Sequence, residues 1–194
     1  MKKIYLILAL VSSTVIVNAQ TAKNKMRIMV GYGLPNIPAA IIGDVDTKTG
    51  PYEIGYKVFL SDKFSIGLMY NYASASTKTA LDYDPNGNAY SYNFDVSFST
   101  FLTQLDYAWV NKTSHNWYSG LSLGYANVTA NLKANLNVIT GSSNPTFTAA
   151  NSGFAYHLTL VGYHGTLGKG FGVYSELGYG FNGIFNAGLS YSFD

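Results

Sequence analysis

Phe171-Gly-Val-Tyr-Ser-Glu-Leu-Gly-Tyr-Gly-Phe181 is the stretch that decides the fold, because large apolar side chains fill most of its odd positions and glycine, tyrosine or glutamate its even ones. This two-residue period predicts a β-strand with one apolar face. The Asn182-Gly183 pair predicts a tight two-residue hairpin, in which both turn residues need a positive φ. A second alternating strand is expected at 185–193. Glu176 must therefore face the side opposite to the aromatic residues.

Six further segments show the same alternation of apolar and polar residues. They are expected to be strands at 26–34, 52–60, 64–72, 101–109, 117–125 and 154–165. Short turns are expected at 61–63, 111–116 and 168–170, and longer connections at 35–50, at about 76–91 and up to Asn151. Large aromatic residues beside the short turns or the terminus are expected to form a girdle at one membrane interface. They are Phe64, Tyr107, Trp109, Trp117, Phe171 and Phe193.

Eight such strands, joined alternately by long and short connections, are typical of an outer-membrane barrel, because a closed sheet pairs every backbone group that lies in lipid. The predicted fold class is all-β: an eight-stranded antiparallel up-and-down transmembrane β-barrel with short periplasmic turns and longer extracellular loops. The alternative is a secreted, soluble sandwich, in which the aromatic side would gather in a common interior and Glu176 would meet water.

The start of the chain has the features of a secretory signal peptide. Met1-Lys2-Lys3 is basic, residues 4–17 are mostly apolar, and Val17-Asn18-Ala19 offers the small residues of a cleavage site. The apolar run is shorter than the roughly twenty residues that a membrane-spanning helix needs. We therefore expect residues 1–19 to be removed, and residues 20–194 to form one barrel domain in the outer membrane of a Gram-negative bacterium.

Composition excludes several classes of function. Twelve Lys and Arg, less Lys2 and Lys3, leave ten in the mature chain against ten Asp and Glu, so its formal net charge is zero. No basic patch indicates nucleic-acid binding. The chain has no cysteine, which excludes a disulfide framework.

The polar side of the strands carries five charged residues that we expect inside the barrel. They are Arg27, Glu53, Lys57, Asp106 and Glu176. An eight-stranded barrel is just wide enough for side chains to fill it, so passage of solutes is not expected. Unpaired buried charges are costly, and we expect Arg27 and Lys57 to pair with the carboxylates as a structural ionic plug. A proton or ion path is the alternative.

Gly188-Leu-Ser-Tyr-Ser-Phe193 and the strand pattern over residues 26–193 resemble the OmpA/OmpX-type family of small eight-stranded outer-membrane barrels. The resemblance implies that Gly188, Leu189, Tyr191 and Phe193 form the C-terminal signal read by the barrel-insertion machinery. It also implies outer-membrane lipid as the surroundings, and periplasmic chaperones as partners during assembly. The chain departs from the family at Asp194, which follows the usual terminal Phe.

Above the fourth and fifth strands the apolar residues change parity. They are Phe94, Val96 and Phe98, then Val128, Ala130, Leu132, Ala134, Leu136 and Val138. A bulge would produce this change, and so would strands that leave the lipid as a protruding sheet. We favour the protruding sheet, which OmpX-like barrels also have and whose free edge could accept a partner's strand. Mobile polar loops are an equally weighted alternative.

Two sequence features could carry chemistry, and neither is expected to do so. Residues 82–88 have the first half of a calcium-loop spacing, but Asn93 stands where the bidentate Glu would be, so no metal or other cofactor is expected. His157 and Thr159 share a face without a nearby carboxylate, and His115 and His164 have no motif. We predict a non-enzymatic barrel with a structural or adhesion-like role through its outer loops, contacting an extracellular protein or cell surface. The alternatives are a narrow porin-like channel and a lipid-modifying enzyme.

Overall fold

The computed structural model describes residues 25–34, 45–77, 80–83, 89–136 and 146–193. The expected signal peptide at 1–19 lies outside this part of the chain, as do Val138, Asp194 and residues 84–88 of the candidate calcium loop. Among the described residues, no helix has the length and apolarity needed to cross a membrane.

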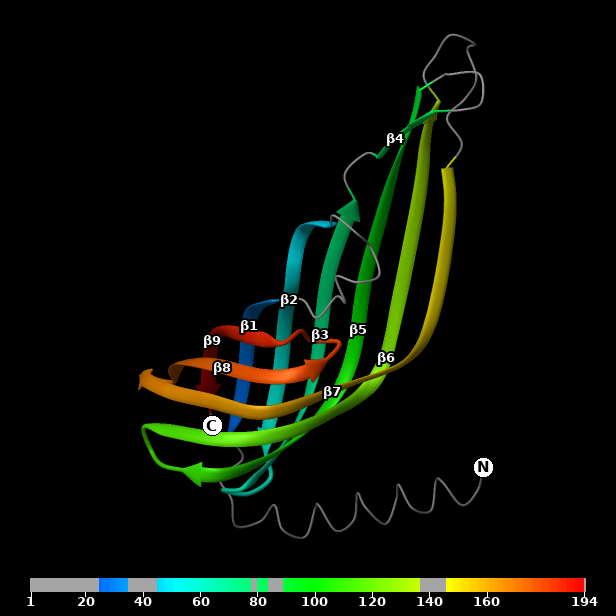
Figure 1. The fold of residues 1–194 in the computed structure, drawn as a ribbon. Helices are drawn as coiled ribbons and strands as arrows, with labels where there is room; N and C mark the ends of the chain where they lie inside the picture. Colours follow the sequence, from blue (N-terminus) through cyan, green and yellow to red (C-terminus); the bar gives the residue numbers. More distant parts are fainter. Residues whose placement is uncertain (1–24, 35–44, 78–79, 84–88, 137–145, 194) are drawn as a thin grey trace, which may run out of the picture.

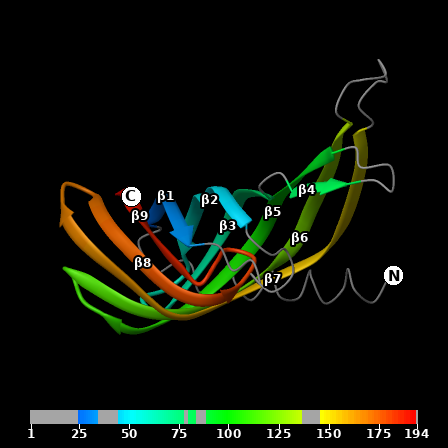
Figure 2. The same cartoon turned by 45° about the horizontal axis from the view of Figure 1, so that its top comes forward.

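The described residues form nine β-strands, and every pair of neighbours is antiparallel. The strands are β1 (Met26–Leu34), β2 (Val45–Phe59), β3 (Phe64–Thr77), β4 (Ala80–Tyr83), β5 (Ala89–Asn111), β6 (His115–Leu136), β7 (Thr146–Gly168), β8 (Phe171–Gly180) and β9 (Phe185–Phe193). Eight of them close a ring, because β1 pairs with both β2 and β9 while β3 pairs with β5. Short β4 pairs with β5 outside the ring (Figures 1 and 2).

The barrel is apolar on its outer surface and polar inside. Leu68, Leu160 and Leu189 are 64%, 56% and 60% exposed, whereas Lys57, Gln104 and Glu176 are 3%, 1% and 1% exposed. A soluble sandwich would show the reverse arrangement, so that alternative is wrong. An outward apolar surface around a closed, polar interior is the arrangement that lipid requires.

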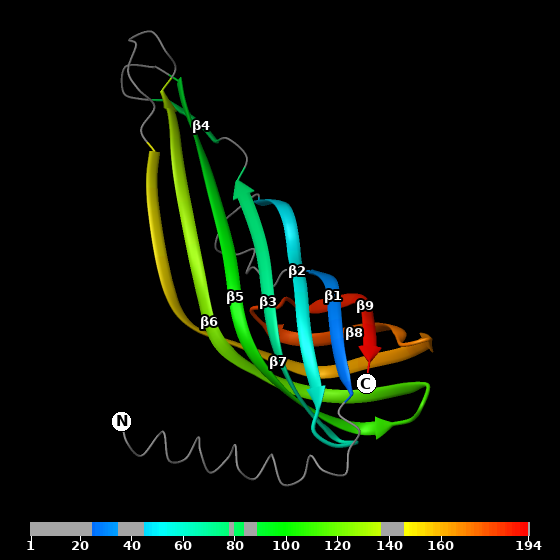
Figure 3. The same cartoon turned by 180° about the vertical axis from the view of Figure 1, so that it is seen from behind.

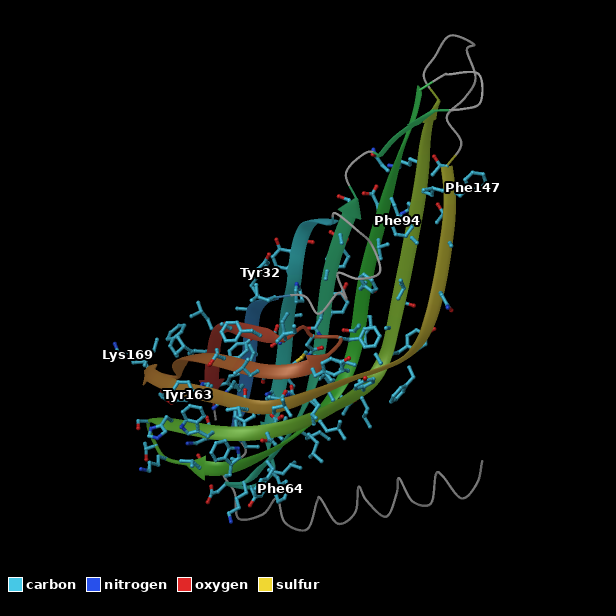
Figure 4. All side chains as sticks on the ribbon, in the orientation of Figure 1. Tyr32, Phe64, Phe94, Phe147, Tyr163 and Lys169 are labelled. Atoms are coloured by element: carbon cyan, nitrogen blue, oxygen red, sulfur yellow. The ribbon has the colours of Figure 1, made fainter. Side chains whose placement is uncertain are left out.

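Aromatic contacts reinforce the short-turn end of the barrel. The rings of Phe64 and Tyr107 lie 5.2 Å apart, and those of Trp109 and Trp117 lie 5.9 Å apart. Figure 4 places Phe64 at this end, far from Phe94 and Phe147. The structure thus brings four of the six expected girdle residues together in two pairs across neighbouring strands, and the other two, Phe171 and Phe193, both contact Tyr191. Aromatic side chains at this end are typical of a membrane interface.

Three strands extend well beyond the barrel. β5, β6 and β7 contain 23, 22 and 23 residues, whereas β8 contains 10. Their outer parts, together with β4, form what we call the outer sheet: 80–83, 89–99, 127–136 and 146–156 (Figures 1 and 3).

No bulge causes the change of parity at the base of this sheet. The β5–β6 register runs without interruption from Tyr90↔Leu136 to Ala108↔Tyr118. Even-numbered residues of β5 and β6 therefore stay on the lumen-side face along the whole strand. Below the boundary that face is polar, and above it that face is apolar, because the strands there have left the lipid. This confirms the protruding sheet rather than a bulge.

The predicted turn at Asn182-Gly183 is wrong in detail. Lys169 is the only non-glycine residue with a positive φ in the described chain, so Asn182 does not adopt the expected conformation, although Gly183 has a φ of 102°. The last paired residues are Leu177 and Phe185, which makes the connection longer than two residues. The connection bends because the Asn182 side chain is drawn into the barrel and is fully buried.

β7 contains a bulge that the sequence does not reveal. Its pairing with β8 shifts register between Thr159 and Val161. Before the shift, odd residues such as His157 point inward; after it, even residues do so, and His164 is 3% exposed. The expected parity of 154–161 is therefore correct only as far as the bulge, which adds His164 to the interior.

Candidate functional site

Lys57 is the centre of the charged cluster in the lumen. Its Nζ lies 2.8 Å from Oδ2 of Asp106 and 3.5 Å from Oε1 of Glu176. These residues come from β2, β5 and β8, so the ammonium group joins three separate parts of the barrel wall. Ser65 donates a further hydrogen bond to Oδ2 of Asp106 at 3.2 Å. One buried cation thus holds two buried carboxylates, as a low-dielectric interior requires.

Two tyrosines complete the cluster, and sequence reasoning gave them no role. Tyr118 donates to Oε1 of Glu176 at 2.6 Å, and Tyr174 donates to Oε1 of Glu53 at 2.8 Å. Both hydroxyls are buried and sit on long, stiff side chains that reach across the lumen. Their inward parity, shared with Glu176, was the signal that could have identified them.

Arg27 does not join the cluster as expected. Its Nε donates to Oγ of Ser192 at 3.1 Å, and its guanidinium carbon lies 4.7 Å from the centre of the Phe59 ring. Among the described residues, the ion pairs inside the barrel are those of Lys57. The expected pairing of Arg27 with a carboxylate is therefore wrong in this part of the chain, because Arg27 contacts Ser192 and Phe59 while its cross-strand neighbour Lys57 holds Asp106 and Glu176.

A second polar layer lies toward the outer end of the barrel. Nδ2 of Asn71 donates to Oδ1 of Asn182 at 2.8 Å and to Oγ1 of Thr100 at 3.2 Å. Nδ2 of Asn182 in turn lies 2.8 Å from Sδ of Met69. The β8–β9 connection therefore caps the lumen with its own side chain. The two layers fill the barrel with interactions that link strands across it.

Neither buried histidine, His157 or His164, contacts a carboxylate among the described residues, and exposed His115 contacts Ser114, with 3.1 Å between Nδ1 and Oγ. His157 is fully buried, and neither its ring nitrogens nor Oγ1 of Thr159 has a hydrogen-bond partner there. Nε2 of His164 lies 2.8 Å from Oγ of Ser190, a pair that the bulge in β7 creates. No described carboxylate contacts that pair, so a group that would orient the base is missing. The described residues also bring together no set of three His, Asp or Glu side chains suited to a metal.

The outer sheet carries an apolar row on the face that continues the lumen side. Phe94 pairs with Leu132, and Leu132 pairs with Phe147, so the three side chains lie on one face. Leu132 and Phe147 are 37% and 64% exposed. Figure 4 shows Phe94 and Phe147 on the outer extension of the sheet. Exposed apolar side chains at this height stand outside the lipid-facing band and form a surface for contact.

One edge of the outer sheet is open in the described structure. β7 pairs with β8 only from His157 onward, so residues 146–156 pair with β6 alone. The carbonyl of Tyr156 accepts the last bond from the β8 side, from the amide of Phe181 at 3.1 Å. Because backbone groups alternate along a strand, the even residues from Thr148 to Phe154 turn their amides and carbonyls toward the open side.

The residues of the expected assembly signal lie on the closing strand. β9 joins β1 in register from Phe193↔Met26 to Phe185↔Leu34. Leu189 and Tyr191 face outward, and Gly188 lies against Val30 and Tyr174, where a Cβ would clash with the Val30 carbonyl. Recognition of this strand by insertion machinery stays a prediction.

Some known proteins of solved structure have a similar architecture. No protein-family model and no curated protein sequence matches the chain. Among solved structures, Ail, the attachment invasion locus protein of Yersinia pestis, aligns with a TM-score of 0.50 and 12% identity, over 89% of this chain and 100% of Ail. Ail in complex with the heparin analogue sucrose octasulfate aligns with a TM-score of 0.49 and 12% identity, over 89% of this chain and 100% of Ail. The N-terminal β-barrel domain of Pseudomonas aeruginosa OprF aligns with a TM-score of 0.48 and 12% identity, over 88% of this chain and 98% of that domain. By its fold, the chain is a closed, eight-stranded antiparallel β-barrel, an architecture that it shares with Ail.

Proposed function

We propose that this protein binds partners at the bacterial surface through the outer sheet, with the barrel as a membrane anchor whose lumen is closed by side chains. The observation that carries the proposal is the open edge of β7 above the barrel. The partner we propose is an extended segment of an extracellular or cell-surface protein. Such a segment would add a strand to the edge of the sheet.

The composition of the edge supports this role. Exposed edge strands are normally protected by charged residues, proline or bulges, which prevent unwanted strand pairing. Residues 146–156 contain no charged residue and no proline, and their pairing with β6 has no register shift. Thr148, Ala150 and Phe154 therefore offer backbone groups that a partner strand can use, whereas the amide of Ser152 already donates to Oδ1 of Asn151 at 2.8 Å.

The apolar row supplies side-chain contacts beside that edge. Phe147 lies on β7 itself, and Leu132 is its neighbour on β6. Backbone pairing provides affinity with little sequence preference, whereas apolar side chains next to the edge select what packs against them. We therefore propose a partner strand with large apolar residues at alternate positions on that face.

The contacts across the lumen argue against the alternative of a narrow channel. Lys57, Glu176 and Tyr118 link β2, β8 and β6 through buried contacts. Opening a path past them would separate buried charges from their partners, which is costly. The role of the five lumen charges in this proposal is structural.

Export and localisation complete the proposal. Residues 1–19 direct the chain out of the cytoplasm and are removed, and the mature barrel is inserted into the outer membrane through the signal in β9. N-terminal sequencing of the protein from purified outer membranes is expected to begin near Gln20. A chain that retains Met1, or that fractionates away from the outer membrane, would contradict this part.

The edge is tested by a proline at Ala150, whose amide faces the open side, so that pairing with β6 is kept. The matched control is Ala150→Thr, which changes the side chain but retains the amide. Bacteria that display the A150P variant should lose attachment to a host-cell monolayer, and those with A150T should keep it. Equal attachment by both variants, at equal surface levels, would rule out the edge as the binding site.

A further inference from the structure

A cavity of about 910 Å³ opens at the short-turn end of the barrel, opposite to the outer sheet. It is lined by the start of β1, the β2–β3 and β5–β6 turns, and the ends of β7 and β9. Its volume is in the range of pockets that hold small molecules. We call it the basic vestibule, because its charged lining residues are Lys25, Arg27, Lys63, Lys112 and Asp62.

The charge of the vestibule is local. Four cations and one carboxylate give its described lining a formal excess of three positive charges, whereas the mature chain as a whole is neutral by sequence. Deeper in the barrel, the next carboxylate, Asp106, is already bound by Lys57 at 2.8 Å. The excess is therefore not compensated by the described residues of the lumen wall.

Arg27 gives the vestibule a fixed anion-binding group. Arg27 lines the cavity, its Nε donates to Oγ of Ser192 at 3.1 Å, and its guanidinium carbon lies 4.7 Å from the centre of the Phe59 ring. A guanidinium held in this way loses little freedom when it binds an oxyanion through two parallel hydrogen bonds. Lys25, Lys63 and Lys112 are exposed at the rim, and each can turn toward a ligand.

We propose that the basic vestibule binds a phosphate group, either as free phosphate or as the headgroup of an anionic phospholipid. A phosphate carries up to two negative charges and several strong acceptor oxygens, which suits one fork-shaped donor and several ammonium groups arranged around a volume. A carboxylate has one charge and one plane and would use Arg27 alone. This site is at the opposite end of the barrel from the outer sheet and does not depend on the surface-binding role.

The test uses the mature protein refolded in a maltoside detergent and a phosphate-free buffer, because phosphocholine detergents would occupy the site. Amide chemical shifts are followed by NMR in titrations with inorganic phosphate and, separately, with short-chain phosphatidylglycerol. Acetate at matched ionic strength is the control anion. Saturable shifts at Lys25, Arg27, Lys63 and Lys112 are expected with at least one phosphate ligand, and the ligand that produces them identifies the source.

Two variants distinguish phosphate binding in the basic vestibule from nonspecific attraction of anions to positive charge at this end of the barrel. The double substitution K63Q/K112Q removes two exposed cations of the rim and should weaken binding by about tenfold. The matched control is K169Q, at the third short turn, because Lys169 is exposed at the same end but does not line the cavity. It should bind as the wild type does. Absence of saturation with both phosphate ligands, equal shifts with acetate, or equal loss of binding in K169Q would overturn the proposal.

Discussion

Inside the barrel, Nζ of Lys57 lies 2.8 Å from Oδ2 of Asp106, and the two side chains are only 4% and 6% exposed. The same ammonium group lies 3.5 Å from Glu176, so a single cation neutralises carboxylates from two other strands. This contact between β2, β5 and β8 closes the lumen and makes Lys57 the residue on which the interior depends most.

Replacing Lys57 with methionine keeps the length of the side chain and removes its charge. Asp106 and Glu176 are then left buried without a cation, and we expect the free energy of unfolding to fall by about 3–5 kcal/mol. Urea unfolding in lipid vesicles, followed by heat-modifiable migration on gels, measures this loss. The control is K133M on the outer sheet, where we expect a change within about 0.5 kcal/mol. Equal stability of the two variants would contradict a central role for Lys57.

Removing the charge of Glu176 tests whether the lumen is a closed plug or a path for ions. In E176Q, the Tyr118 hydroxyl keeps a partner while Lys57 loses one of its two carboxylates, so we expect a loss of about 1–3 kcal/mol in unfolding free energy. Planar-bilayer recordings should show no channel current for the wild type or for the variant. Steady current through the wild-type protein would favour the porin-like alternative instead.

The Tyr174–Glu53 hydrogen bond joins β8 to β2 across two intervening strands, at 2.8 Å. Y174F deletes only the donor, and we expect it to cost about 1.5–3 kcal/mol because the acceptor is a buried carboxylate. A double-mutant cycle with E53Q isolates the pair, and the coupling energy should be at least about 0.5 kcal/mol. Additive losses would show that the two side chains act independently.

The terminal strands were predictable because a lipid-facing strand alternates strictly between apolar and polar residues. β1 and β9 occupy the expected residues, 26–34 and 185–193, since each stays within the membrane and alternates over its whole length. β2, β3, β5, β6 and β7 extend further than expected. Their outer parts carry polar residues on the face that no longer meets lipid, so the alternation that marks a strand changes there.

The sequence predicted which charged residues face the lumen better than it predicted which of them contact one another. Inward parity places Glu53, Lys57, Asp106 and Glu176 inside the barrel, where the structure also finds them. Which of these side chains contact one another depends on how far along the barrel axis each of them lies, and a bulge changes that position. The bulge in β7 brings His164 to Ser190, and Arg27 lies near Phe59 instead of a described carboxylate. The two-residue period of the sequence predicts neither the bulge in β7 nor the contact of Arg27 with Phe59.

Asn182 shows why a strong local turn signal gave the wrong turn. Its buried amide bonds to Asn71 and contacts Met69, and these tertiary interactions outweigh the preference of Asn-Gly for a two-residue hairpin. N182A leaves the Asn71 amide without that acceptor, and we expect a loss of about 1–3 kcal/mol in thermal or urea unfolding. The control is N127A, which removes an exposed contact with Ser152. Similar losses for the two variants would argue against Asn182 as the cap of the lumen.

The open edge of β7 predicts an alternating pattern of hydrogen exchange. The Tyr156 carbonyl points toward β8, and backbone groups alternate in direction along the strand, so the amides of Ala149, Asn151 and Gly153 face β6 and those of Ala150 and Phe154 face the open side. The Ser152 amide is left out of the comparison because it donates to Oδ1 of Asn151 at 2.8 Å. Amides bonded within a sheet exchange only when it opens locally, so we expect the β6-facing set to exchange at least about tenfold more slowly. NMR exchange measurements in detergent micelles resolve the two sets. Slow exchange at Ala150 and Phe154 would mean that another part of the chain already covers the edge, and the binding site proposed there would have to be abandoned. Fast exchange that becomes slow when a partner is added would locate the partner's strand on this edge, since only a new backbone acceptor protects those amides.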